Sequence, residues 1–295
     1  MTKNAWPKIM LIGKNGQIGW ELHRTLATLG QVAAYGRAEL DLTNIGEIRE
    51  CVRALRPNVI VNAAAYTAVD KAEEEPELAM AVNGIAPGIL AEEAKIVGAV
   101  LVHYSTDYVF DGDKVTPYGE EDQPNPVNVY GKTKLEGERF IQSTDVPHLI
   151  LRTSWVYGLR GNNFLLTITR LSKHRNEIRV VNDQVGSPTW SRLVAEATAQ
   201  ILANGRNIIA GNQGIYHASA TGQTTWFGFA QEIIGNVSSD CNPRMVPIST
   251  EEYGMLAERP AYSVLNNGKL SKAFGLVIPE WKNGVALALD IVKVL

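Results

Sequence analysis

The first half of the chain alternates short apolar runs with longer segments in which apolar residues recur every three or four positions. The runs lie at residues 8–13, 31–36, 58–65, 99–105 and 148–153. They have the length and composition of strands that are buried on both faces. The segments between them have the spacing of amphipathic helices. This repeated order predicts a parallel, doubly wound α/β sheet with right-handed crossovers.

Two of the predicted helices have distinctive local features. Asp41 or Thr43 is expected to cap the helix that begins near Ile45, because short polar side chains accept hydrogen bonds from the free N–H groups of a helix start. Residues 76–97 are expected to form a helix that Gly84 and Pro87 interrupt or bend. A polar connection over residues 111–128 then leads to a helix over residues 130–140.

The second half of the chain is less regular. Helical spacing is expected at 163–174, 191–203 and 226–234, and strands at 178–181 and 214–218. Beyond residue 240, repeated prolines break the pattern into short pieces. With no low-complexity linker, this half is expected to pack directly against the first.

Composition narrows the classes of protein that remain. The chain has 295 residues and a formal net charge of −3, which gives no basic footprint for nucleic acid. Cys51 and Cys241 form no CxxC pair, so reduced thiols are expected rather than disulfides or a zinc site. The first seven residues are too short and polar for a signal peptide, and no apolar run approaches the ~20 residues of a membrane span. We expect a soluble, cytoplasmic protein that binds neither nucleic acid nor membrane.

A glycine-rich loop joins the first predicted strand to the first helix. Its first glycine allows a tight turn, its second a close approach of ligand to backbone, and its third close packing of helix on strand. The free N–H groups at the helix start favour phosphate. In this setting the loop predicts a dinucleotide site, with expected contacts at Gly13, Asn15, Gly16, Gln17, Ile18 and Gly19.

The end of the second predicted strand indicates which dinucleotide binds. An acid there would bond the ribose hydroxyls of NAD, whereas an arginine pairs with the 2′-phosphate of NADP. Arg37 follows this strand, and Glu39 is the first acid beyond it. We therefore expect NADPH, with NADH left open as an accepted alternative. The remaining expected cofactor contacts are Asp41 and Leu42 near the adenine, and the small residues Ala63, Ala64 and Ala65 after the third strand.

Reactive side chains follow the fourth predicted strand. Thr106 ends it, and Tyr130 and Lys134 lie four residues apart on one face of the next helix. A phenol titrates near ~10, and a nearby ammonium is expected to lower that pKa. Lys134 is also expected to hold the nicotinamide ribose, and Thr106 a substrate oxygen. These three residues are the predicted catalytic group: they would exchange a proton with a carbonyl or alcohol oxygen while a nicotinamide exchanges hydride with the carbon.

Together these signals predict a Rossmann-type fold with two unequal parts. The dinucleotide-binding domain is expected over residues 1–155, with a returning strand near 214–220. A smaller, mainly substrate-binding C-terminal domain is expected over residues 156–295.

The chain resembles the extended short-chain dehydrogenase/reductase superfamily and, within it, the dTDP-4-dehydrorhamnose reductases. The matching segments extend over nearly the whole chain in the family's order. They are GKNGQIGWEL (13–22), NAAAYTAVDKAE (62–73), VHYSTDYVFDG (102–112), NVYGKTKLEGE (128–138), RTSWVYG (152–158), NNF (162–164), NDQVGSPT (182–189) and RPAYSVL (259–265).

The resemblance implies a nucleotide-sugar substrate and a reaction in dTDP-rhamnose biosynthesis. NADPH would reduce the C4 keto group of dTDP-4-dehydro-L-rhamnose to give dTDP-L-rhamnose, a donor for surface polysaccharide. Tyr130 would donate the proton, Lys134 would position the ribose and tune Tyr130, and Thr106 would hold the keto oxygen. The resemblance adds further substrate contacts at Val69, Asp107, Trp155 and Arg259.

The sequence departs from the family pattern at two places. Some members are thought to dimerise through magnesium held by glutamates; Glu21 matches one such position, but Arg192 stands where an acid is expected, and residues 290–295 lack the matching Glu. Because Mg²⁺ requires several oxygen ligands, we expect no metal site and either a monomer or a homodimer. Tyr262 and Val264 replace residues that are often Asn and Arg, which leaves the base and sugar preference open.

Three alternatives remain at this stage. A GDP-sugar epimerase–reductase would need an additional Cys–His pair, which the sequence does not place near the tyrosine and lysine. A 4-reductase with a talose product stays open, because the sequence does not show which sugar face meets the cofactor. A non-catalytic regulator resembling the regulatory subunit of methionine adenosyltransferase would keep the nucleotide fold, but the intact Thr106, Tyr130, Lys134 and Trp155 argue against it.

Overall fold

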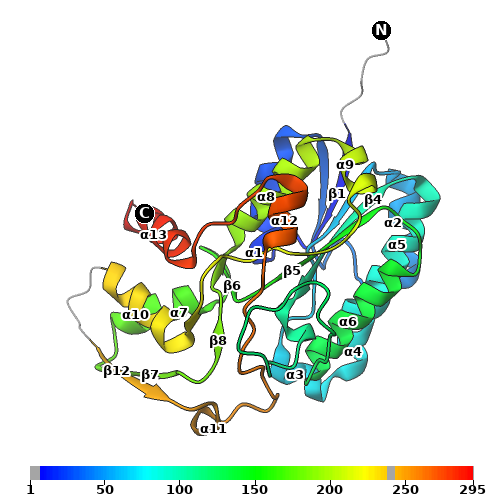
Figure 1. The fold of residues 1–295 in the computed structure, drawn as a ribbon. Helices are drawn as coiled ribbons and strands as arrows, with labels where there is room; N and C mark the ends of the chain where they lie inside the picture. Colours follow the sequence, from blue (N-terminus) through cyan, green and yellow to red (C-terminus); the bar gives the residue numbers. More distant parts are fainter. Residues whose placement is uncertain (1–6, 238–242, 295) are drawn as a thin grey trace.

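The computed structural model describes residues 7–237 and 243–294. A six-stranded sheet lies at its centre in the order β10-β5-β4-β3-β1-β2, and each neighbouring pair is parallel (Figure 1). Its strands are β1 (Lys8–Ile12), β2 (Gln31–Tyr35), β3 (Val59–Asn62), β4 (Val100–Thr106), β5 (His148–Thr153) and β10 (Gly214–His217). The predicted parallel α/β sheet is confirmed.

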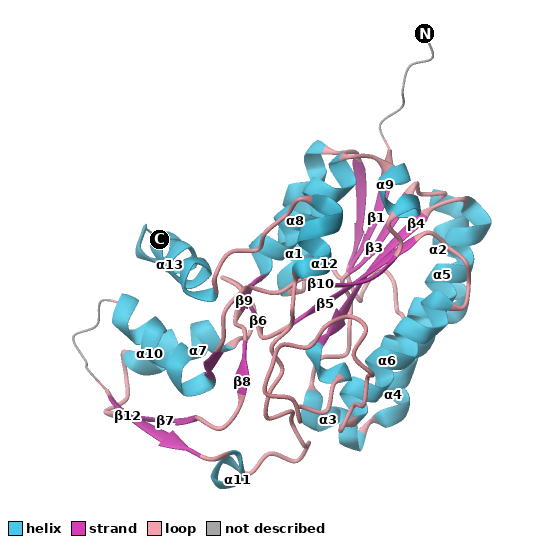
Figure 2. Ribbon diagram, in the orientation of Figure 1, coloured by secondary structure: helices cyan, strands magenta, loops and turns pink. Residues whose placement is uncertain are grey.

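Helices cover both faces of this sheet (Figure 2). Every residue of β3 and β4 is buried, as expected for parallel strands between two helical layers. On one face α1 (Gln17–Thr25) packs against α8 (Ser191–Ala203). On the other face α5 (Ala86–Val97) packs between α2 (Ile45–Leu55) and α6 (Val129–Gln142).

Two local predictions have different outcomes. The interruption in the long helix is confirmed, because the π-helical turn η2 (Ala81–Ile85) joins α4 (Pro76–Met80) to α5. The predicted cap of α2 is wrong: Asn44 accepts the hydrogen bond from Glu47 N at 3.2 Å. The Asp41 carboxylate instead accepts hydrogen bonds from the backbone and hydroxyl of Thr43. Asn44 directly precedes the first helical residue, which is where a side chain reaches the free N–H groups.

Other short helices connect these layers. They are η1 (Leu26–Thr28), α3 (Val69–Glu74), η3 (Asp107–Val109), α9 (Arg206–Gly211) and α12 (Gly268–Phe274).

The remaining elements gather beside the sheet, from its left side to the bottom of Figure 1. The short strands pair as β6 with β9, β7 with β12 and β8 with β11. One buried apolar cluster continues from β1 and β4 into α10 and α13, so these elements share a core with the sheet. The elements are β6 (Val156–Tyr157), α7 (Phe164–Ser172), β7 (Glu177–Val181), β8 (Val185–Gly186), β9 (Thr189–Trp190), β11 (Thr224–Thr225), α10 (Trp226–Asn236), β12 (Arg244–Ile248), α11 (Thr250–Tyr253) and α13 (Trp281–Val294).

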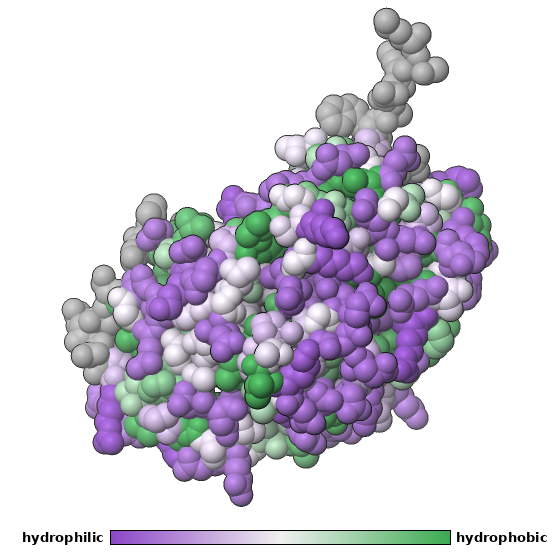
Figure 3. All heavy atoms as spheres, in the orientation of Figure 1, coloured by the Kyte–Doolittle hydropathy of each residue, from purple (hydrophilic) through white to green (hydrophobic). Residues whose placement is uncertain are grey.

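Hydrophilic residues cover most of the face drawn in Figure 3, and apolar residues appear there in scattered patches. Within residues 7–237 and 243–294, no helix combines the length and apolarity needed to cross a membrane. Cys51 on α2 is half-buried, whereas Cys241 lies outside the described residues.

The sheet order also indicates where a ligand would bind. The chain passes from β1 to β2 on one side and then returns to β3 on the other side of β1. In open α/β sheets the crevice beyond the carboxyl ends of the strands, at such a reversal, is the usual ligand site.

Candidate active site

The glycine-rich loop follows β1 and has the geometry that a dinucleotide requires. Gly13 has φ +90°, and a Cβ there would lie 2.6 Å from Ala64 N. A Cβ at Gly19 would collide with the Gly13 carbonyl. Gly16 precedes α1 without any side-chain cap, so the first N–H groups of the helix are left for a ligand. The loop therefore fits a dinucleotide pyrophosphate.

Glu39, the first acid beyond β2, is held against the end of that strand. Glu39 folds back so that one carboxylate oxygen accepts a hydrogen bond from Gly36 N at 2.7 Å and the other accepts one from Lys14 Nζ at 2.8 Å. An acid that bonds a ribose hydroxyl would occupy this position. Arg37 lies beside it, exposed. In the sequence, the signal for this arrangement is that Glu39 lies three residues after Gly36, which follows β2.

The other predicted cofactor residues occupy different environments. Leu42 is buried in the apolar cluster beside β1. Asp41 is occupied by Thr43, and this hydrogen bonding lowers the pKa of the Asp41 carboxyl. Ala63 and Ala64 directly follow β3 and are half-buried. Their backbone lies against Gly13. Ala65 is half-buried in the same segment.

Gln17 and Ile18 open α1 directly after the loop. Gln17 Nε2 donates to Val156 O at 3.3 Å, and its buried Oε1 has no hydrogen-bond partner among the described residues. Asn15 lies near Gly36, because a Cβ on Gly36 would be 2.6 Å from Asn15 Nδ2. The loop and the end of β2 are thus brought together.

Helix α6 is fixed against the end of β4 at its first turn. Asn128 Oδ1 accepts a hydrogen bond from Gly131 N at 2.8 Å, while Asn128 Nδ2 donates to Glu258 O at 2.8 Å. A Cβ on Gly131 would collide with the Tyr108 carbonyl in η3. This close approach places Tyr130 near Thr106, whose hydroxyl opposes the rise that burial causes in the pKa of Tyr130.

Thr106 and Asp107 form a buried polar pair beneath Tyr130. Thr106 Oγ1 donates to Asp107 Oδ1 at 3.0 Å, and Ser154 Oγ donates to Asp107 Oδ2 at 2.9 Å. Burial raises the pKa of Asp107 to about 6, and hydrogen bonds from Ser263, Ser154 and Thr106 oppose that rise. Because a threonine hydroxyl has one proton, Thr106 must turn away from Asp107 before it can donate to a substrate.

Lys134 is only 1% exposed, and its amine contacts strand β4. Its Nζ donates to Tyr104 O at 2.6 Å and lies 3.2 Å from His103 Nε2. Burial lowers the pKa of Lys134 to about 8, and the charge of Glu138 opposes this. The prediction that Lys134 lowers the pKa of Tyr130 is wrong for this arrangement. Burial raises the pKa of Tyr130, and the hydrogen bond with Thr106 opposes that rise.

Trp155 leaves β5 in an unusual backbone conformation, with φ +45°. Its ring stacks on Trp226 with centroids 3.6 Å apart and an angle of 3° between the planes. Gly186 leaves room for this pair, since a Cβ there would overlap Trp155. The sequence predicted a helix that begins at Trp226 but gave no sign that its ring packs on Trp155.

Val69 was predicted on the sugar side and Arg259 on the diphosphate side, and their segments approach each other near Tyr130. Arg259 pairs with Asp70 at 2.9 Å, and Asp70 follows Val69 at the start of α3. Burial raises the pKa of Tyr108 to about 12, while the charge and hydrogen bond of Arg259 oppose this. The Tyr108 ring meets Tyr130 edge-on at 5.6 Å. Val69 and Arg259 therefore lie on the segments that border the tyrosine.

The position suggested by family magnesium sites has a cation nearby. Burial raises the pKa of Glu21, and the charges of Arg192 and Arg24 oppose this. Arg192 itself pairs with Glu196 at 2.8 Å. In the part of the chain that the structure describes, no group of three or more His, Cys, Asp or Glu residues could hold a metal ion.

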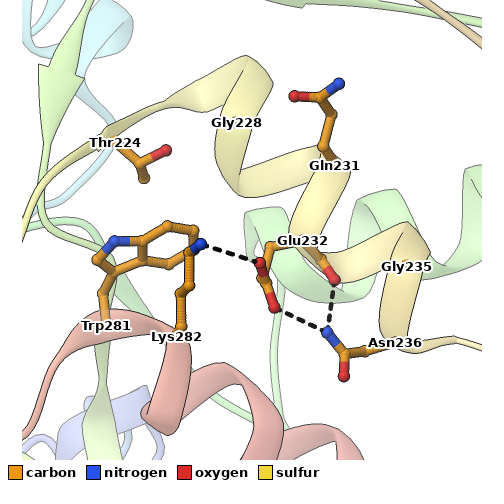
Figure 4. Close-up of a pocket in the computed structure, with 8 residues that line it drawn as sticks. All are labelled: Thr224, Gly228, Gln231, Glu232, Gly235, Asn236, Trp281 and Lys282. Atoms are coloured by element: carbon orange, nitrogen blue, oxygen red, sulfur yellow. Dashed lines mark hydrogen bonds and ion pairs between the residues drawn. The ribbon is translucent and has the colours of Figure 1, made fainter.

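A hollow of about 450 Å³ lies apart from this crevice, between α10 and α13 (Figure 4). Lys282 Nζ is 3.9 Å from Glu232, and Asn236 Nδ2 donates to the same carboxylate at 2.9 Å. None of the predicted site residues lines it. The predicted site residues therefore lie away from this hollow.

Known proteins resemble this chain over nearly its full length. A sequence model of the family described as "RmlD substrate binding domain" matches residues 7–294. A dTDP-4-dehydrorhamnose reductase of Burkholderia thailandensis is 47% identical, with 96% of this chain and 98% of that protein covered. One of Escherichia coli strain K12 is 44% identical, with 96% and 97% covered.

Solved structures give the same result. A dTDP-4-dehydrorhamnose reductase from Bacillus anthracis in complex with NADP has a TM-score of 0.89 and 38% identity, covering 97% of this chain and 99% of that one. A UDP-glucose 4-epimerase from Thermus thermophilus, in complex with NAD, has a TM-score of 0.81 at 19% identity, covering 97% and 99%, and shares the fold alone.

The fold and the site together define an extended short-chain dehydrogenase/reductase. Within that class, the chain belongs to the dTDP-4-dehydrorhamnose reductase family.

Proposed function

We propose that this protein uses NADPH to reduce the C4 keto group of dTDP-4-dehydro-L-rhamnose, which gives dTDP-L-rhamnose. The observation that carries the proposal is that the half-buried Tyr130 lies with the buried Thr106, Asp107 and Lys134 at the end of β4, near the glycine-rich loop. The identities of 47% and 44% to reductases named for this reaction support it over nearly the full chain.

Tyr130, Lys134 and Thr106 have different proposed roles in the reduction. When bound, the reduced nicotinamide supplies hydride to C4. Tyr130, whose burial keeps it protonated at neutral pH, donates its proton to the C4 oxygen. Lys134 holds the cofactor ribose while its Nζ stays anchored to the Tyr104 carbonyl. Thr106 turns from Asp107 to donate to the keto oxygen, and Ser154 remains to satisfy the carboxylate.

Cofactor and substrate are held by opposite sides of the crevice. On the cofactor side, the loop Gly13–Gly19 and Ala63–Ala65 hold the pyrophosphate region, while Arg37, Asp41 and Leu42 border the adenosine. On the substrate side, Trp155 offers an aromatic face. Val69 and Arg259 border the sugar and the diphosphate, and Arg259 Nε has no partner among the described residues.

The test is the loss of reduced-nicotinamide absorbance when purified protein meets NADPH and freshly made dTDP-4-dehydro-L-rhamnose, with the product identified by NMR. Oxidation with formation of dTDP-L-rhamnose is the expected result, and a parallel reaction with NADH measures the cofactor preference. A talose product would contradict the stereochemistry. NADPH binding without oxidation of any keto-sugar nucleotide would contradict the assignment as an enzyme.

A further inference from the structure

His103 lies in the middle of β4, fully buried between two polar side chains. Its Nε2 is 3.2 Å from Lys134 Nζ, and its Nδ1 is 3.2 Å from Nδ2 of Asn62, its register partner on β3. Asn62 Oδ1 accepts a hydrogen bond from Ala64 N at 3.2 Å. These contacts form a polar chain from the loop after β3 to the lysine.

The chemistry of an imidazole constrains this chain. Burial and the charge of Lys134 lower the pKa of His103 well below its ordinary value, so the ring is neutral. A neutral imidazole donates through one nitrogen and accepts through the other. While Asn62 Oδ1 is occupied by Ala64 N–H, Asn62 Nδ2 donates to Nδ1, and the ring proton lies on Nε2. In that state His103 donates to the amine form of Lys134.

The ammonium form of Lys134 needs the opposite arrangement. An ammonium is a donor only, so Nε2 must accept and the ring proton must lie on Nδ1. The Asn62 amide then has to turn its oxygen toward His103, which releases Ala64 N–H. A change of charge on Lys134 is thereby transmitted to Ala64, whose backbone lies against Gly13 of the loop.

We propose that His103 is a positioning residue that hydrogen-bonds Lys134 in both charge states and, through Asn62, links that state to the loop at Ala64. The inference rests on the proposed function, in which Lys134 holds the cofactor ribose. It adds a reason for a histidine at this buried position: no aliphatic side chain can both accept and donate.

Other groups around Lys134 set its electrostatic background. Glu138 lies one turn further along α6 and pairs with Arg152 of β5, at 2.6 and 2.9 Å. Tyr130 lies one turn back on the same helix face. The hydrogen-bonding contacts of Nζ in the described chain go to His103 and the Tyr104 carbonyl. Removing the His103 contact therefore changes a contact that Glu138 and Tyr130 do not supply.

His103→Leu and His103→Gln form a matched pair for the test. Leucine fills the space without polar atoms, whereas the glutamine amide can present its oxygen or its N–H to Nζ by rotation. We expect NADPH to bind about tenfold more weakly to the leucine variant, with kcat reduced by about the same factor. The KM for the sugar nucleotide should stay near the wild-type value. The glutamine variant should restore both NADPH binding and kcat.

The pH profile separates positioning from a purely structural role. The ammonium loses an acceptor in His103→Leu, and hydrogen bonds to charged groups are the stronger ones. The fall of kcat at high pH should therefore move to lower pH by about one unit in this variant. In His103→Gln it should return to the wild-type position. Equal losses in both variants, with unshifted profiles, would overturn the proposal.

A readout independent of turnover is the ¹⁵N NMR signal of the His103 ring in the unmodified protein. We expect its proton to lie on Nδ1 below the pKa of Lys134 and on Nε2 above it, and Lys134→Met should abolish this change. A ring proton that stays on the same nitrogen at every pH would overturn the proposal. The wild-type protein could show the tautomer change, and His103→Leu the weaker NADPH binding, while no turnover is found. In that case the reaction is misassigned and the role of His103 stands.

Discussion

Tyr130 and Lys134 are held in environments that disfavour their charged forms. Burial raises the pKa of Tyr130 and lowers that of Lys134 to about 8. Tyr130 therefore keeps its proton at neutral pH and is ready to donate it, as a reductase requires. Lys134 is charged only on the acid side of its shifted pKa, which makes its charge the part of the site most sensitive to pH.

We predict that turnover falls as the pH rises through about 8. The folded-state pKa of Lys134 lies below its ordinary value, so the ammonium is present below that pH and lost above it. The measurement is kcat against pH with both substrates saturating. A profile that stays flat to two units above this pKa would show that the Lys134 charge is not needed.

Arg37 and Glu39 are predicted to act in opposite directions on the choice of cofactor. Arg37→Ala removes a partner for the 2′-phosphate and should weaken NADPH by about tenfold or more, with little effect on NADH. Glu39→Gln removes a negative charge and frees Lys14, so NADPH should bind more tightly. Dissociation constants for both cofactors test this. Equal effects of Arg37→Ala on the two would mark it as an ordinary surface residue.

At this scale the sequence reveals residues whose partners are near along the chain. The placement of Tyr130 and Lys134 on one face of α6 could be predicted because one helical turn separates them. Trp226 could not, since its partner Trp155 lies in a different element and the two meet only through the fold. The direction of the Tyr130 shift was also out of reach, because it depends on burial and on where the Lys134 ammonium points.

Among the elements, α6 matters most because it carries Tyr130, the proposed proton donor, and Lys134. Its start is set by the Asn128 cap and by the contact of Gly131 with the Tyr108 carbonyl. Both lie within one turn of Tyr130. The position of the helix against η3, rather than its own stability, therefore decides whether Tyr130 reaches Thr106.

Gly131→Ala is predicted to push α6 away from η3. The added methyl group collides with backbone, so the variant should lose about 1–3 kcal/mol in the free energy of unfolding, and kcat should fall with it. Gly235→Ala is the matched control in α10, where the added Cβ meets no described atom within 4 Å apart from its chain neighbours and the nearby backbone of its own helix. It should gain about 0.5–1 kcal/mol and keep its activity. Chemical denaturation measures the stability of both variants, and a turnover assay measures their activity. Wild-type stability and turnover in Gly131→Ala would contradict the prediction.

The long elements of the first half were predictable because their periods are clear over many residues. The break at η2 was also predictable from Gly84 and Pro87. The pairs β6–β9 and β8–β11 were not, since each strand has two residues and no period to detect. Their pairing depends on the arrangement of the whole second half.

At the scale of the whole molecule, a buried ion pair joins α6 to the central sheet. Glu138 of α6 and Arg152 of β5 are 0% and 1% exposed, and their charged groups approach to 2.6 Å. Such a pair adds little net stability compared with an apolar pair, but breaking it leaves an uncompensated buried charge. The helix that carries Tyr130 is thereby fixed relative to β5, the strand that leads to Trp155.

Glu138→Gln is predicted to lose about 3–5 kcal/mol in the free energy of unfolding, because Arg152 keeps its charge without a carboxylate. Glu136→Gln on the same helix is the control, since Glu136 pairs with the exposed Arg139 and should change stability by at most about 1 kcal/mol. Denaturant unfolding of both variants makes the comparison. Equal, small effects would show that the buried pair does not hold α6 to the sheet.

The measurement that tests the central claim most directly is the comparison of NADPH binding with turnover in Tyr130→Phe. Tyr216→Phe serves as the control, because Tyr216 lies on β10, the outer strand of the sheet, and the change removes only a part-buried hydroxyl that donates to Asn212 O. Tyr130→Phe should retain NADPH affinity and lose about 10²- to 10⁴-fold in kcat, whereas Tyr216→Phe keeps both. Near-normal turnover in Tyr130→Phe would contradict the assignment of this crevice as the reductase site.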